Sequence, residues 1–281
     1  GGVHRLFTQE FGRLGIDVTF VQPTQARAWK RALRKTTRAL FLETPTNPLI
    51  RVIDIEPLAQ LCTAQGLALL VDSTFATPMN FRPLEHGADV VIHSATKYLN
   101  GHSDVLGGVV LGTSSYVEEV RQQMMVRGQA PDPFACWLLE RGLKTLDVRV
   151  QRQNENALAV ATWLAGQSAV ATVHYGGLPD SPDHEVAKAQ MSGFGGMLAF
   201  ELAGGGQPHP GLELLLAEDL RGMREALVEE RRRPFLEVFR RHRRRAVCAR
   251  REAAAHVAGA DAQVHEHRRV RRLGKLEPAL D

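Results

Sequence analysis

The sequence is poor in cysteine and has no long apolar run. Only three cysteines occur in 281 residues, at positions 62, 136 and 248, and their spacing matches neither a metal site nor a disulfide framework. Cys62 and Cys136 lie in apolar helical patterns, so we expect both thiols to be buried. No apolar segment is long enough to cross a membrane, and no signal peptide is visible. These absences favour a cytoplasmic protein with no membrane partner and no metal site.

Positive charge is unevenly distributed along the chain, whose formal net charge is +4. Residues 1–207 contain 18 Lys and Arg against 19 Asp and Glu, a net charge of −1. Residues 208–281 contain 17 against 12, a net charge of +5. The first 207 residues therefore lack the basic character typical of nucleic-acid-binding proteins, and we expect no nucleic acid partner for them.

Lysine is also scarce, and one of the six lysines has an unusual position. Lys97 closely follows an apolar segment at 88–93 that is typical of a strand, and Asp72 ends the preceding apolar segment at 67–71. In an open α/β sheet, both residues would lie at the edge where ligands bind. A lysine amine can form a Schiff base with pyridoxal phosphate, and a carboxylate can keep the ring nitrogen of this cofactor protonated. We expect the amine to be partly desolvated, because the free amine is the nucleophile.

Two hydroxyl side chains accompany Lys97. Ser94 and Thr96 can bind the phosphate of the cofactor, together with backbone N–H groups of the turn. Taken singly, an Asp, Ser or Thr after a strand most often forms a turn, and a lysine is most often a solvated surface charge. The combination on two successive strands favours a cofactor site.

Five ordered blocks of sequence resemble the Cys/Met-metabolism family of pyridoxal-phosphate enzymes, and the resemblance extends from about residue 3 to residue 206. The family includes cystathionine γ-synthase, the cystathionine lyases, methionine γ-lyase and the homoserine-ester sulfhydrylases. Five blocks in the same order are far more specific than one short motif. The blocks are Glu43–Pro48, Val71–Phe75, His93–Tyr98, Gly101–Gly108 and Arg141–Leu146.

The resemblance implies catalytic and cofactor-binding roles. Lys97 would form the internal aldimine with pyridoxal 5′-phosphate and would then carry protons to and from the substrate. Asp72 would pair with the ring nitrogen, and Ser94 and Thr96 would bind the phosphate.

Three further residues are assigned by the same resemblance. Asn47 would lie near the ring hydroxyl, although a residue before Pro48 is also typical of a turn. Thr74 would help to bind the cofactor, and Glu43 would line the substrate pocket. The resemblance also implies a small amino-acid substrate and a homo-oligomer, a dimer of dimers, because subunits of this family share their active sites.

The order of predicted elements fits the fold that the resemblance implies. This fold is the α/β fold of pyridoxal-phosphate-dependent transferases (aspartate aminotransferase-like, fold type I), with a mostly parallel sheet covered by helices. Strands are predicted at 16–20, 39–42, 67–72, 88–94 and 105–111, and helices at 3–14, 24–37, 54–65 and 114–127. A long helix over 133–165 would lead to a partial, smaller α/β domain with strands at 170–175 and 197–202 and a helix at 183–191.

Three segments follow from this organisation. We expect a large cofactor-binding domain at 1–132, a bridging helix with a partial small domain at 133–207, and an Arg-rich tail at 208–281. Asp183, His184 and Glu185 raise the question of a metal site, but acidic residues where a helix begins are more often capping and surface charges.

The ends of the chain depart from the family pattern. The family's N-terminal part carries a phosphate-binding loop and a tyrosine that stacks on the cofactor, and neither is present, so we expect the chain to be truncated at its N-terminus. The arginine that binds the substrate α-carboxylate also has no convincing match in the tail. The tail is either a genuine basic interaction segment or the product of a shifted reading frame. The second is favoured, because the family's small domain should continue here and its strands and arginine motif do not appear.

The sequence therefore predicts a pyridoxal-phosphate-dependent lyase or transferase of sulfur amino acid metabolism, of the cystathionine γ-synthase or γ-lyase type. One alternative is a catalytically inactive fragment of such an enzyme. Another is a basic nucleic-acid-binding protein that uses residues 221–251. A Rossmann dehydrogenase is not favoured, because no G-x-G-x-x-G motif follows the first strand.

Overall fold

The structure, a computed structural model, describes residues 2–22, 26–203 and 212–215. Every described residue belongs to one unit of the chain, within residues 1–220. Most of the predicted tail at 208–281, including the 221–251 region considered for nucleic acid binding, lies outside the described residues.

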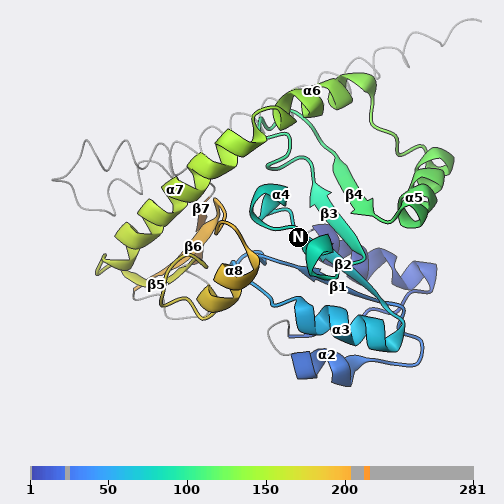
Figure 1. Ribbon diagram of the computed structural model, residues 1–281, viewed down its shortest axis with the longest axis horizontal. Helices are drawn as coiled ribbons and strands as arrows, with labels where there is room; N and C mark the ends of the chain where they lie inside the picture. Colours follow the sequence, from blue (N-terminus) through green and yellow to red (C-terminus); the bar gives the residue numbers. More distant parts are fainter. Residues whose placement is uncertain (1, 23–25, 204–211, 216–281) are drawn as a thin grey trace, which may run out of the picture. The chain divides into compact units, whose positions relative to one another are not determined.

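A four-stranded sheet forms the first half of the described chain (Figure 1). The first three strands are parallel, and the fourth runs antiparallel to the third. The mostly parallel sheet predicted from the sequence is thus confirmed. The last strand reverses because the segment between the third and fourth strands contains no crossover helix, which a parallel connection would need. In order across the sheet, the strands are β1 (Ala39–Glu43), β2 (Ala68–Asp72), β3 (Val90–Ser94) and β4 (Gly108–Gly112).

Helices α2 (Ala26–Ala32) and α3 (Glu56–Gln65) cover one face of this sheet. The alternating pattern of β1 and β2 turns every second side chain toward these helices. Helix α3 begins near Pro57 and ends at Gly66, whose φ of 64° allows its N–H to bond the Cys62 carbonyl. The core between sheet and helices contains Trp29, Leu40, Leu42, Ile55, Leu58, Cys62, Leu69, Val71 and Val91.

A second, antiparallel sheet contains β5 (Val170–His174), β6 (Leu198–Leu202) and β7 (Leu212–Leu215) (Figure 1). In the sequence, helix α8 (His184–Gln190) follows β5 and precedes β6. Helix α7 (Leu146–Ala165) packs against β5. One stripe of α7 is buried at helical spacing, at Val150, Ala157, Val160, Ala161 and Leu164. Strand β7 lies beyond residue 207, where the sequence placed the end of the small domain, and pairs with β6.

The remaining helical elements are short or exposed. Helix α5 buries none of its residues. No helix among the described residues has the length and apolar character needed to cross a membrane. These elements are α1 (Gly2–Arg5), η1 (Leu6–Glu10), η2 (Gly12–Leu14), α4 (Thr77–Asn80), η3 (Pro83–His86), α5 (Ser114–Arg127) and α6 (Pro133–Leu143).

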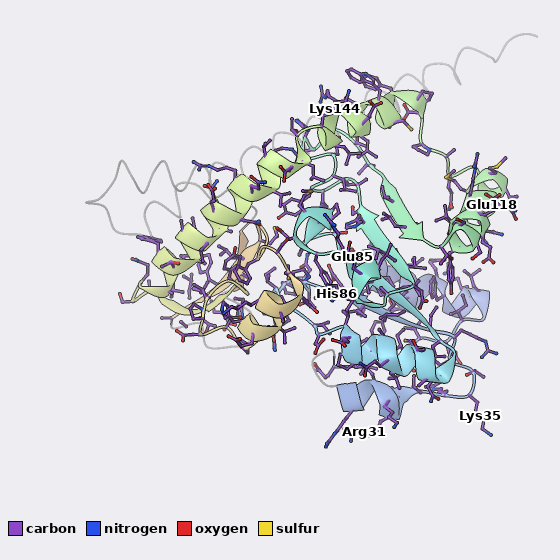
Figure 2. The ribbon with its side chains drawn as sticks, in the orientation of Figure 1. Arg31, Lys35, Glu85, His86, Glu118 and Lys144 are labelled. Atoms are coloured by element: carbon purple, nitrogen blue, oxygen red, sulfur yellow. The ribbon has the colours of Figure 1, made fainter. Side chains whose placement is uncertain are left out.

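Two sequence predictions about elements are wrong. Residues 16–20 do not form a strand, because this segment pairs with no strand of the described chain and leaves Phe20 58% exposed. The long helix expected over 133–165 is divided into α6 and α7 at Lys144 and Thr145 (Figures 1 and 2). It divides because the Gly142 carbonyl bonds the Thr145 N–H at 3.3 Å and the Arg149 side chain at 2.8 Å.

The cysteine predictions are half correct. Cys62 is buried in the core, and burial raises the pKa of its thiol to about 11. Cys136 is exposed on α6, although its apolar surroundings in the sequence predicted burial. The apolar face of α6 is itself exposed at Phe134 and Trp137, so apolar neighbours in the sequence do not imply burial here.

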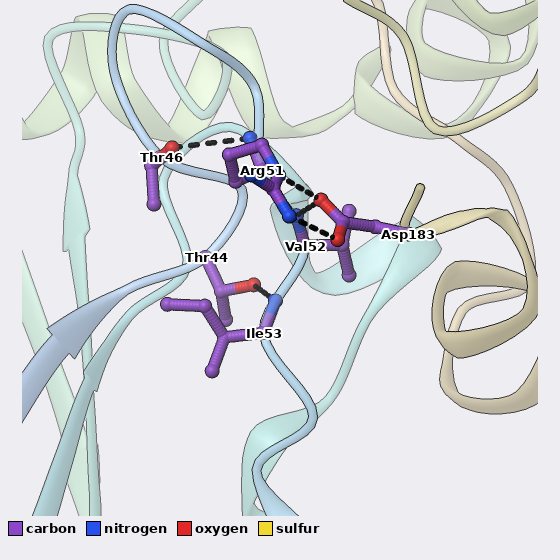
Figure 3. Close-up of polar contacts among 6 residues, drawn as sticks. All are labelled: Thr44, Thr46, Arg51, Val52, Ile53 and Asp183. Carbon is purple, nitrogen blue, oxygen red and sulfur yellow. Dashed lines mark hydrogen bonds and ion pairs between the residues drawn. The ribbon is translucent and has the colours of Figure 1, made fainter. Parts of the chain in front are cut away.

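An ion pair between Arg51 and Asp183 ties the loop after β1 to the start of α8 (Figure 3). The Arg51 Nε and Nη2 atoms donate to the two Asp183 oxygens at 2.5 and 2.8 Å, and the Val52 N–H donates to the same carboxylate at 3.0 Å. Asp183 is only 7% exposed. The expectation that Asp183 caps the helix is therefore wrong, since its side chain makes no cap hydrogen bond and is occupied by Arg51 instead.

We predict that Arg51→Met lowers the free energy of unfolding by roughly 2 kcal/mol, because it leaves a buried carboxylate without its guanidinium partner. Urea denaturation monitored by circular dichroism measures this loss. Arg82→Met is the matched control, since the Arg82–Glu85 pair is well exposed, and its loss should stay below about 0.5 kcal/mol. Equal losses in the two variants would contradict the stabilising role of the buried pair.

Candidate active site

The predicted site residues lie where three neighbouring strands end. Glu43 and Asp72 are directly opposite each other in the parallel register of β1 and β2, and Asp72 is opposite Ile92 on β3. Ser94 is two residues beyond Ile92, so it shares its face of the sheet. Residues from three distant parts of the sequence thus meet at one edge, as the sequence predicted.

Thr74 connects the ends of β2 and β3 through its hydroxyl group. The Oδ1 atom of Asp72 accepts hydrogen bonds from the Thr74 N–H at 3.0 Å and from the Thr74 hydroxyl at 2.6 Å. The same hydroxyl accepts a bond from the Ser94 N–H at 2.8 Å. One oxygen of the carboxylate is therefore held in place, while Oδ2 accepts no hydrogen bond from the described residues.

Lys97 lies in a tight turn directly after β3. Its N–H bonds the Ser94 carbonyl at 3.1 Å, and its carbonyl accepts the Gly101 N–H at 2.7 Å. The Lys97 side chain is exposed and forms no ion pair with the described residues. The partial desolvation that the sequence predicted for this amine is thus not provided by the part of the chain that the structure describes.

The Thr96 hydroxyl has a partner on the other side of the turn. The hydroxyl accepts a hydrogen bond from the Gly107 N–H at 3.1 Å, and the backbone N–H of Thr96 donates to the Gly107 carbonyl at 3.3 Å. Thr96 therefore joins the turn to the start of β4. Because the backbone N–H groups of Ser94 and Thr96 are also bonded, these two groups are not available for a phosphate.

Glu43 is a half-buried carboxyl beside a second carboxylate. Burial, with a further contribution from the charge of Asp72, raises the pKa of Glu43 to about 7, and a hydrogen bond from the Asn47 backbone partly counteracts this shift. The backbone of Asn47 therefore lies close to the strand edge, while the residue is exposed. Glu43 is poised to hold or release a proton near neutral pH.

His93 is a neighbour of the site that sequence reasoning did not single out. It is 3% exposed on the covered face of the sheet, and burial lowers its pKa, although the charge of Asp72 acts in the opposite direction. The histidine is therefore neutral at pH 7. The sequence could have indicated this position, because His93 lies between Ile92 and Ser94 in a strand. Alternation along the strand puts its ring on the face opposite Ser94.

The model of the family described as Cys/Met metabolism PLP-dependent enzyme matches residues 1–216. The chain belongs to this family. Over 203 residues it is 43% identical to cystathionine gamma-lyase of Bacillus subtilis, a match that covers 72% of the chain and 54% of the relative. It is 42% identical to O-succinylhomoserine sulfhydrylase of Pseudomonas aeruginosa, with 73% and 51% covered.

Solved structures of the family have the same fold. The crystal structure of cystathionine gamma-lyase from Lactobacillus plantarum, complexed with L-serine, matches with a TM-score of 0.71 and 42% identity. That match covers 73% of this chain and 54% of the other. The α/β fold of type I expected from the sequence is confirmed, and the chain spans about half the length of the relatives described above.

The residues at the strand edge fit pyridoxal phosphate, the cofactor of this family. Asp72 offers a carboxylate with one oxygen held by Thr74 and the other available for a ring N–H. Lys97 offers an exposed primary amine, and Ser94 offers a hydroxyl. This donor set has the three chemical functions that the ring nitrogen, the aldehyde and the phosphate require.

We predict that Glu43→Gln changes how stability depends on pH. A carboxyl whose pKa is raised on folding stabilises the fold fully below its unfolded pKa of 4.5, and this contribution is lost as pH rises through about 7. The variant, which cannot ionise, should therefore gain roughly 1 to 2 kcal/mol relative to the wild type between pH 5 and pH 8, after allowance for solvent screening.

Urea denaturation at the two pH values measures this gain. Glu118→Gln is the matched control, because Glu118 is exposed on α5 (Figure 2), and its difference from the wild type should not change with pH. Parallel pH profiles for Glu43→Gln and the wild type would contradict the raised pKa.

Proposed function

We propose that this chain forms part of a pyridoxal-phosphate-dependent lyase or transferase that acts on a sulfur amino acid or an activated homoserine ester. The observation that carries the proposal is the Asp72–Thr74–Ser94 hydrogen-bond network beside the turn of Lys97, all at one sheet edge. Membership of the family and the similarity to a cystathionine gamma-lyase and a sulfhydrylase support the substrate class.

Each residue has a role that follows from its chemistry. Pyridoxal phosphate, when bound, supplies an electron sink for the electron pair released at the substrate's Cα. Lys97 would hold the cofactor through its amine and would act as the general base that takes the Cα proton. Asp72 would accept a hydrogen bond from the protonated ring nitrogen, and Thr74 keeps the carboxylate oriented.

The remaining candidate residues surround this pair. The hydroxyl groups of Ser94 and Thr96 would bind the phosphate, and Thr96 also joins the turn to the start of β4 through Gly107. Asn47 would lie near the ring hydroxyl of the cofactor, and Glu43, which is opposite Asp72 in the strand register, would line the substrate pocket.

The organisation of the chain is part of the same proposal. We propose a large cofactor-binding domain at 1–132, a bridging helix and partial small domain at 133–207, and a distinct segment at 208–281; the two separate sheets support the first boundary. We also propose a cytoplasmic homo-oligomer, a dimer of dimers. Exposed apolar side chains at Met125, Val126, Phe134 and Trp137 on α5 and α6 support association.

We predict that the purified chain with added pyridoxal phosphate develops a visible absorbance band that borohydride removes. After reduction, tryptic digestion and mass spectrometry should find the phosphopyridoxyl group on Lys97. Lys97→Ala should lack the band, whereas Lys144→Ala should keep it, because Lys144 is an exposed lysine at the α6–α7 junction (Figure 2). A band that survives in Lys97→Ala would contradict the assignment, and no band in any protein would indicate an inactive fragment.

We predict that Asp72→Asn weakens pyridoxal phosphate binding about tenfold or more, because a neutral amide cannot stabilise the charged ring nitrogen as a carboxylate does. Fluorescence titration with the cofactor measures the dissociation constant. Asp180→Asn removes an exposed carboxylate and should leave the constant unchanged. Equal affinities for Asp72→Asn and the wild type would exclude the proposed contact.

A further inference from the structure

The guanidinium group of Arg149 bonds backbone carbonyls of two chain segments, the turn that carries Lys97 and the end of α6. Arg149, on the first turns of α7, donates from Nη1 to the Tyr98 carbonyl at 2.9 Å and from Nη2 to the Gly142 carbonyl at 2.8 Å. A longer contact of 3.5 Å joins Nη2 to the Leu99 carbonyl. Its Nε atom bonds the Thr145 hydroxyl at 3.0 Å, which orients the planar group.

Two of these carbonyls belong to the turn that carries Lys97. The turn is stabilised internally by the bonds from the Asn100 N–H to the Ala95 carbonyl and from the Gly101 N–H to the Lys97 carbonyl. Its last carbonyls point out of the turn with a partial negative charge, as at the end of a helix. A guanidinium is suited to this place because its rigid fork can bond several carbonyls at once.

The glycines around Arg149 show how close the segments are. Gly101 has a φ of +74°, and a Cβ atom there would overlap the Arg149 guanidinium. A Cβ at Gly142 would overlap the Asn100 carbonyl. Both glycines thus leave the space in which the turn, α6 and Arg149 meet.

A second contact ties the same turn to α6. The Asn100 side chain donates to Asp104 at 2.7 Å, and Arg141 donates to the other oxygen of Asp104 at 3.3 Å. The hydrogen bond from Asn100, with a smaller contribution from Arg141, holds the pKa of Asp104 below its ordinary value. The turn is therefore held by two arginines, directly by Arg149 and through Asp104 by Arg141.

The Lys97 amine, in contrast, has no partner among the described residues that could hold it. The flexible four-carbon stem makes its position depend on where the backbone of the turn is held. A backbone shift of about 1 Å at a reacting group is enough to reduce a rate by roughly a hundredfold. The contacts that hold the turn thus decide how often the amine meets a bound aldehyde.

We propose that Arg149 is a positioning residue for Lys97, which holds the turn so that the amine faces the cofactor aldehyde. The proposal rests on the proposed function, in which Lys97 bonds the cofactor. It assigns to Arg149 an effect on the covalent step that is separable from cofactor affinity.

The test compares Arg149→Met and Arg149→Lys with Arg152→Met. Arg152 lies on the same helix, but its side chain is 58% exposed and pairs with Glu155. Two measurements use the full chain: the rate at which pyridoxal phosphate becomes attached to Lys97, and the affinity for pyridoxamine 5′-phosphate. The second compound has no aldehyde, so it reports binding without the covalent step.

Arg149→Met should slow attachment at least tenfold and change the affinity for pyridoxamine 5′-phosphate less than threefold. Arg149→Lys should lie between this variant and the wild type, because it keeps the charge but loses the fork. Arg152→Met should match the wild type in both measurements. A parallel fall of rate and affinity, or no fall of either, would overturn the proposal.

Hydrogen exchange of the cofactor-free chain provides a measurement that does not need the cofactor. A peptide that covers residues 95–101 should exchange faster in both Arg149 variants than in Arg152→Met, at a temperature where all are folded. Unchanged exchange would overturn the proposal. If the wild type does not attach the cofactor at Lys97, the proposed function fails and this inference fails with it, whereas attachment without an Arg149 effect overturns this inference alone.

Discussion

The parallel register of β1, β2 and β3 is the constraint on which the site depends. Since parallel strands that pair in register end at the same level, the residues that follow them must meet at one edge. Glu43 and Asp72 are opposite each other for this reason, and Ser94 ends the next strand on the same face. The covered face of the sheet supplies the apolar core that holds this register, with Leu42, Val71 and Val91 packed beneath helix α3.

Short hydrogen bonds fix the positions of the polar groups at this sheet edge. The Thr74 hydroxyl donates to Asp72 and accepts from the Ser94 backbone, so a single side chain relates the ends of two strands. Arg51 and Asp183 act over a larger distance in sequence and connect the loop after β1 to the second sheet's helix. The Thr74 hydroxyl and the Asp183 carboxylate are buried, so their hydrogen bonds are shielded from competing water.

The sequence predicted the strands at 39–42, 67–72 and 88–94 well, because each is a short apolar run that ends in polar residues. It failed at residues 16–20, whose alternation is strand-like, since a strand also needs a neighbour to pair with. It failed again at Lys144, where a helix-forming composition continues but the Gly142 carbonyl is bound by a side chain from the next helix. Asp183 was assigned to the surface because no local pattern indicates an arginine 132 positions earlier in the chain.

The sequence by itself determined the family, the type of sheet and the candidate residues for a pyridoxal cofactor, because residue types and their order within short blocks are local properties. Only the tertiary structure decided which of these groups touch, that Asp72 is held through one oxygen, and that Arg149 lies against the turn of Lys97. Those relations join residues up to 51 positions apart, and the folding of the whole sheet and its helices brings them together. The burial of Glu43 and the exposure of Lys97 likewise depend on residues that are distant in the sequence and become neighbours only in the folded chain.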